Sequence, residues 1–111
     1  MSTSGIAQSV GLFLVAGLCE IAGGWLVWQW LRESRPWSWG LFGGLVLCLY
    51  GVIPTFQRVH FGRVYAAYGG FFIVLSFLWG WAVDGDMPDR FDVIGATTSL
   101  AGVLIVMYWP R

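Results

Sequence analysis

The chain has 111 residues, of which 58% are hydrophobic and 11% are charged, and six basic and six acidic residues give a formal net charge of zero. A soluble globular domain carries about 25% charged residues, so this composition excludes one and indicates a membrane protein. The arginines form no basic patch that would bind nucleic acid, and two cysteines and one histidine are too few for a disulfide framework or a metal site.

Four apolar runs are each long enough to cross the bilayer, which takes roughly 20 helical residues. We expect residues 1–111 to form one all-α domain with transmembrane helices over 5–31, 37–56, 62–83 and 92–109. The connections between these runs are short, so neighbouring helices are expected to be antiparallel. Residues 1–10 contain no basic residue, which argues against a cleavable signal peptide and predicts that the first helix is retained.

The first run carries a single carboxylate, Glu20, near its middle. A charged group at bilayer depth costs a few kcal/mol and is a functional-site candidate by default. Four of the six residues that share its helical face are Ala or Gly: Phe13, Ala16, Gly17, Gly23, Gly24 and Val27. This face leaves either room beside the acid or close approach to another helix. The alternative is a protonated Glu20 in a structural hydrogen bond only.

The second run contains a small-residue stripe of Gly40, Gly44 and Gly51, which suits close helix packing within or between subunits. Pro54 is expected to kink or end this helix near Ile53.

The third run places aromatic and small residues on one helical face: Tyr65, Tyr68, Gly69, Phe72, Ser76 and Trp79. Aromatic rings beside a carboxylate suit an organic cation, through Coulomb and cation–π attraction, although helix packing is the alternative. Gly69 and Gly70 form a candidate hinge. Arg63 is interpreted as an interfacial residue whose side chain reaches the headgroups, with gating or pairing to Glu20 as the alternative.

The fourth run follows an acidic connection, 84–92, whose spacing fails the EF-hand pattern. We expect Asp89 or Asp92 to cap the fourth helix instead. In that helix Gly95 and Gly102 form a packing seam with Thr98 and Ser99, either between subunits or within one. Tryptophans near the first and third connections, among them Trp28 and Trp79, predict a belt at one membrane interface.

Membrane orientation depends on the Lys and Arg residues on each side. The side with both termini and the second connection holds Arg58, Arg63 and Arg111. The other side holds Arg32, Arg35 and Arg90. This balance predicts insertion in both orientations and hence an antiparallel homodimer. The acidic residues of the first and third connections favour a cytoplasmic N-terminus instead, but acids contribute little to the rule.

Four motifs point to a known family: residues 18–21 (LCEI), 62–70 (GRVYAAYGG), 83–85 (VDG) and 101–105 (AGVLI). On these, the chain closely resembles the YnfA family of small inner-membrane proteins over nearly its whole length. It more distantly resembles the small multidrug resistance (SMR) transporters, through Glu20, the pattern at 65–70, and Gly95 with Gly102. It departs from them with Tyr68 where they commonly carry Trp, and with Arg32 in place of their usual Lys.

The resemblance implies an SMR-like, antiparallel homodimer in the bacterial inner membrane that exchanges protons for lipophilic or aromatic cations. Glu20 is then the group for which proton and cation compete, with Tyr65, Tyr68, Phe72 and Ser76 beside it. The alternatives are a non-transporting membrane protein that binds lipid or a partner, and an exporter of one small cation such as guanidinium. We expect neither a cofactor nor enzymatic activity, since no nucleophile–base pair is visible.

Overall fold

The structure is a computed structural model that describes residues 3–111. Its elements are α1 (Thr3–Arg32), α2 (Trp37–Val52), the 3₁₀ helix η1 (Ile53–Phe56), α3 (Phe61–Asp84) and α4 (Arg90–Tyr108). Four helices long and apolar enough to cross a membrane are present, counting α2 and η1 as one span, which confirms the all-helical prediction. Their ends lie within two residues of the expected ones.

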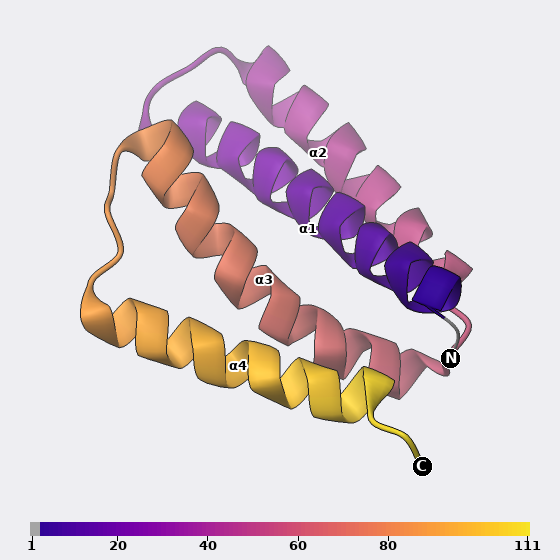
Figure 1. The fold of residues 1–111 in the computed structure, drawn as a ribbon. Coiled ribbons are helices and arrows are strands. Elements are labelled where there is room, and N and C mark those ends of the chain that lie inside the picture. The colour runs from indigo at the N-terminus through magenta and orange to yellow at the C-terminus, as the bar shows by residue number, and fades with distance from the viewer. Residues whose placement is uncertain (1–2) are drawn as a thin grey trace.

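The helices lie in a row, in the order α2, α1, α3, α4 (Figure 1). Consecutive helices in the chain are antiparallel, so α2 is antiparallel to α1 and α4 to α3, whereas α1 and α3 run parallel at the centre of the row. The substantial helix–helix contacts join α1 to α2, α1 to α3, and α3 to α4. The Cα atoms accordingly extend over 49 × 34 × 21 Å. The inner helices α1 and α3 are more buried than the outer helices α2 and α4. A single row of this kind leaves the outer faces of α2 and α4 to lipid or to a second subunit.

The hydrophobic core lies at the end of the row that holds both chain termini (Figure 1). It comprises Phe13, Ala16, Val64, Ala67, Tyr68, Phe71, Val103 and Met107. These residues come from the first halves of the parallel helices α1 and α3 and from the second half of α4, which is antiparallel to them, so all three segments lie at one level. The rings of Phe13 and Phe71 stack with their centroids 4.8 Å apart. At this end, packed side chains therefore fill the space between α1, α3 and α4.

A polar network ties the same end together. The Ser9 hydroxyl donates to Gln57 Oε1 at 2.7 Å and lies 2.9 Å from the Tyr108 hydroxyl, which is placed to donate to it. The Gln57 amide donates to the Ser9 carbonyl at 2.9 Å. Three segments far apart in sequence, the start of α1, the second connection and the end of α4, are joined by this network. Buried polar groups need such partners.

Glycines set the close approach of α1 to α2. A Cβ on Gly23 would lie 2.8 Å from the Gly43 carbonyl oxygen, and a Cβ on Gly43 would lie 2.6 Å from the Gly23 carbonyl oxygen. The two backbones therefore touch. Of the expected glycine stripe on α2, only Gly40 packs on a neighbour, the ring of Trp30, while Gly44 and Gly51 face open space.

The helix ends follow local chemistry. α2 ends at Val52 and the chain tightens into η1 at Pro54, as expected from the missing proline N–H. α3 ends at Gly85, whose φ of 75° is the left-handed conformation that glycine accepts without a steric penalty. Asp89 caps α4 in a reciprocal capping box with Asp92, which confirms the predicted cap.

Candidate functional site

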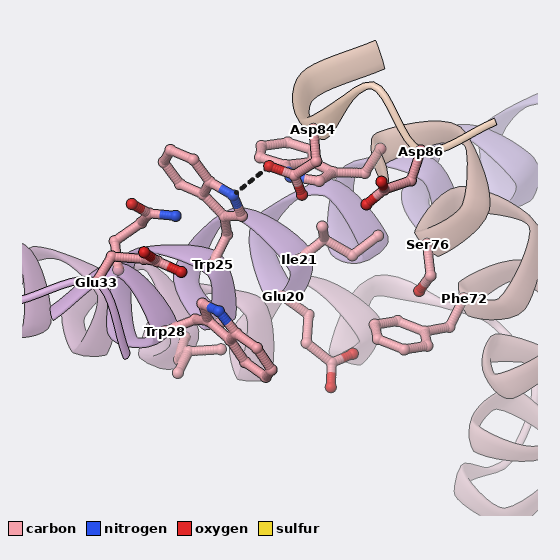
Figure 2. Close-up of a pocket in the computed structure, with 13 residues that line it drawn as sticks. Glu20, Ile21, Trp25, Trp28, Glu33, Phe72, Ser76, Asp84 and Asp86 are labelled. Atoms are coloured by element: carbon pink, nitrogen blue, oxygen red, sulfur yellow. Dashed lines mark hydrogen bonds between the residues drawn. The ribbon is translucent and has the colours of Figure 1, made fainter. Parts of the chain in front are cut away.

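A cavity of about 790 Å³ lies between the second halves of α1 and α3, at the end of the row away from the termini. Figure 2 shows the residues around it. The lining residues are Glu20, Ile21, Gly24, Trp25, Trp28, Gln29, Glu33, Leu47, Phe72, Ser76, Trp79, Asp84 and Asp86. The same two helices thus pack tightly at one end and separate at the other.

Glu20 lies at the inner part of this cavity, with its carboxyl group reaching toward Phe72 (Figure 2). One carboxyl oxygen, Oε2, accepts a hydrogen bond from the hydroxyl of Tyr68 on α3. Tyr68 is buried, with 6% of its surface exposed, and its ring lies 5.3 Å from that of Tyr50 on α2. The acid is therefore held across the α1–α3 interface and faces the protein interior.

The small residues around Glu20 serve two purposes. Gly23 provides the close approach to α2, and a Cβ on Gly17 would collide with the Leu75 side chain of α3. A Cβ on Gly24 would meet nothing within 4 Å, and Gly24 lines the cavity. From the sequence, the face of α1 that carries Glu20 could provide either close approach to another helix or open space beside the acid, and the structure has both.

The cavity walls are aromatic. The ring of Trp25 lies 6.2 Å from that of Trp79 across the α1–α3 gap and 6.2 Å from that of Trp39 on α2. Trp28 also lines the cavity, and the Arg32 guanidinium lies 4.7 Å from the centre of its ring. Trp28 thus already holds a cation of the chain itself against its ring.

The charges that line the cavity are all negative: Glu20, Glu33, Asp84 and Asp86. Asp84 Oδ1 accepts a hydrogen bond of 3.3 Å from the Trp25 indole, which links the outer parts of α3 and α1 (Figure 2). Among the lining residues there is no Lys or Arg. A cleft with one sign of charge and apolar walls concentrates ions of the opposite sign, so this one attracts cations.

The structure brings together most of the predicted binding residues. Glu20, Phe72 and Ser76 line the cavity, and Tyr68 bonds Glu20. Tyr65 does not line it: its side chain is 37% exposed, packs on the ring of Phe61 at 4.3 Å, and borders a separate cavity of about 280 Å³.

Sequence reasoning did not assign to the site seven of the residues that line the cavity: Ile21, Trp25, Gln29, Glu33, Leu47, Asp84 and Asp86. It placed Trp28 in an interface belt, and Trp79 both in that belt and on the aromatic face of the third run, and both residues line the cavity. The signal available was the gathering of tryptophans and acids at one membrane side.

The predicted hinge lies in a helix without interruption, because α3 is continuous through Gly69 and Gly70. Gly70 makes the close contact to α4, against the side chain of Val103 and the carbonyl oxygen of Ser99, whereas Gly69 faces open space. Arg63 lies in the first turn of α3, where its backbone N–H donates to His60 Nδ1, and it does not line the cavity.

The predicted dimer seam on α4 is open in the single chain, since a Cβ on Gly95 or Gly102 would meet nothing within 4 Å. No group of three or more His, Cys, Asp or Glu that would suit a metal ion occurs within residues 3–111.

Comparison with known proteins identifies relatives over nearly the whole chain. The family model described as "Uncharacterised BCR, YnfA/UPF0060 family" matches residues 6–111. A UPF0060 membrane protein of Bacillus licheniformis is 62% identical over 104 residues, which cover 93% of this chain and 96% of the relative. The UPF0060 membrane protein YfjF of Bacillus subtilis is 58% identical over 101 residues, covering 90% and 93%.

A third relative, from Halalkalibacterium halodurans, is a UPF0060 membrane protein that is 59% identical over 107 residues, covering 96% of this chain and 99% of its own. No solved structure matches the chain. With its four spans, the chain belongs to the YnfA/UPF0060 family and is a multi-pass membrane protein of bacteria.

Proposed function

We propose that this protein exports lipophilic or aromatic cations in exchange for protons. The observation that carries the proposal is the position of Glu20, a carboxyl group near the middle of a membrane span that faces an aromatic, negatively lined cavity. Ionisable groups at this depth are costly, and in transporters they mark ion and proton paths.

The cavity suits an organic cation rather than a very small one. Its volume of about 790 Å³ lies in the range of about 300–1,000 Å³ typical of sites for small organic ligands. Phe72 beside Glu20 and Trp25 and Trp79 further out offer ring faces to a delocalised or aromatic cation. A guanidinium-sized ion would leave most of these rings without contact.

Coupling follows if proton and cation use the same carboxyl group. A cation is attracted to ionised Glu20, and a proton that binds there removes the charge and releases the cation. The Tyr68 hydroxyl occupies one carboxyl oxygen by donating to it. The other oxygen is then left for the substrate or the proton, so the two ligands exclude one another.

We further propose that the transporter is an antiparallel homodimer. The row of helices leaves the outer faces of α2 and α4 without a partner within the chain, and the open stripe of Gly95 and Gly102 permits close approach of a second α4. In such a dimer both Glu20 side chains share one chamber. Rocking of the helices about this chamber, with Gly69 and Gly70 as the candidate hinge, gives alternating access.

The test is transport in proteoliposomes that contain the purified protein and an imposed pH gradient. The wild type is expected to move ethidium against its gradient, and Glu20→Gln is expected to insert normally and abolish this movement. Glu33→Gln is the matched control, since it removes a carboxylate at the cavity edge and is expected to retain most transport. Full transport by Glu20→Gln would refute the proposal.

A further inference from the structure

Two hydrogen-bond donors on the α3 wall of the cavity have no acceptor among residues 3–111. They are the Ser76 hydroxyl and the Trp79 indole N–H, and both residues line the cavity. Their spacing of three residues places them on one face of the helix. Figure 2 shows the Ser76 hydroxyl directed from α3 toward the side of the cavity where Phe72 lies.

Such groups are rarely left without a partner, because a buried donor without an acceptor has lost its hydrogen bond to water and gained none in return. A serine within a helix commonly bonds the carbonyl oxygen four residues earlier. In α4, Ser99 does so with Gly95 at 2.9 Å, and Thr98 does so with Ile94 at 2.8 Å. Ser76 has no such bond, so its hydroxyl remains available to a ligand.

The tryptophans on the two walls of the cavity differ in the same way. The indole of Trp25, on α1, donates to Asp84, whereas the Trp79 indole that lies against it has no acceptor. An indole N–H can only donate. The carboxylates that line the cavity are hydrogen-bond acceptors and attract positive charge. Ser76 and Trp79 instead offer hydrogen-bond donors, which can bind an acceptor atom of a ligand.

We propose that Ser76 and Trp79 bind an oxygen acceptor of the transported molecule, so that the preferred substrates are organic cations that also carry a carbonyl, ether or hydroxyl group. This inference rests on the proposed function. The Glu20 carboxyl group reaches toward Phe72, and Ser76 and Trp79 lie four and seven residues beyond Phe72, or about 6 and 10 Å along the helix axis. The substrate is therefore elongated, with its positive centre at Glu20 and its oxygen nearer the cavity mouth.

A matched pair of probes tests this inference: decyltrimethylammonium, and the analogue in which one methylene in the distal half of the chain is replaced by a ketone carbonyl. Binding of each is measured by calorimetry on the purified protein. One net hydrogen bond of about 1 kcal/mol predicts about fivefold tighter binding of the ketone by the wild type. Ser76→Ala and Trp79→Phe are expected to bring the ratio of the two affinities, measured within each variant, from about five to about one, whatever their effect on the affinity for decyltrimethylammonium itself.

Ser99→Ala is the matched control, since it removes a serine hydroxyl that bonds its own helix, and it is expected to retain the fivefold preference. Equal binding of the two probes by the wild type, as expected if water alone satisfies the two donors, would overturn the inference but leave the proposed function in place. Failure of both probes to bind, or binding that is indifferent to Glu20→Gln, would overturn both.

Discussion

Tyr68 donates its hydroxyl hydrogen to Glu20 across the α1–α3 interface, at the level where the packed end of the row meets the cavity. This contact relates the two parts of the molecule. Tyr68 belongs to the hydrophobic core, and Glu20 belongs to the cavity lining. A change of hydrogen-bond partner at Glu20 therefore directly affects Tyr68, a side chain of the hydrophobic core.

Tyr68→Phe is expected to destabilise the protein by about 1 kcal/mol, because the aromatic ring still packs but the part-buried hydrogen bond to the Glu20 carboxyl group is lost. The measurement is unfolding in mixed detergent micelles. Tyr65→Phe is the control, since the Tyr65 side chain is 37% exposed and lies outside the cavity. Equal loss in the two variants would show that the Tyr68–Glu20 hydrogen bond contributes nothing particular.

Gly43→Ala is expected to destabilise the protein by about 1–3 kcal/mol, because the new methyl group would lie 2.6 Å from the carbonyl oxygen of Gly23 and force α1 and α2 apart. Gly44→Ala adds a methyl group to the next residue, where nothing lies within 4 Å, and is expected to be neutral or slightly stabilising. Thermal unfolding of the two variants in detergent compares them. The account of the α1–α2 contact fails if their midpoints coincide.

Ser9→Ala is expected to cost about 1–2 kcal/mol, since it removes the hydroxyl that joins Gln57 to Tyr108 and leaves these part-buried groups without that partner. The loss should be localised at the terminal end of the row, and hydrogen exchange at the start of α1 and the end of α4 would detect it. Thr97→Ala, at an exposed position of α4, serves as the reference and should leave this exchange unchanged.

Gly102→Leu is expected to convert the proposed dimer to a monomer without unfolding the chain, because the position faces open space within one subunit. Light scattering of the detergent-solubilised protein gives the mass. Gly11→Leu places the same bulk at another open position on α1 and should leave the dimer intact. If the Gly102→Leu variant remains dimeric, the subunit interface does not include the stripe of Gly95 and Gly102.

Insertion in both orientations is expected from the three arginines on each side of the membrane. Reporter proteins fused after Arg111, one active only in the cytoplasm and one only outside it, should show comparable activity. If a single reporter is active, the orientation is fixed and an antiparallel dimer of this chain is excluded.

The sequence was sufficient for the helices, because hydrophobic length, proline and capping aspartates are local signals. Pro54 ends α2 and Asp89 starts α4 through interactions within a few residues. Glu20 was also recognisable, since a lone acid in an apolar run is conspicuous without knowledge of its neighbours.

The rest depends on how helices face one another, which no local signal specifies. The glycine whose backbone touches the backbone of α1 is Gly43, next to the predicted stripe rather than in it, while Gly40 of the stripe contacts α1 only through the ring of Trp30. Tyr65 and Tyr68 looked equivalent at helical spacing, yet only Tyr68 reaches Glu20, because α1 crosses α3 one turn further along. The Ser9–Gln57–Tyr108 network joins residues up to 99 positions apart, and no local sequence pattern indicates it.

The central claim is that one carboxyl group, Glu20, serves both proton and cation. It is tested most directly by adding tetraphenylphosphonium to weakly buffered, detergent-solubilised protein and recording the pH. The account predicts that wild-type protein releases protons as the cation binds and that Glu20→Gln releases none. Cation binding without proton release by the wild type at every pH, or undiminished release by Glu20→Gln, would contradict it.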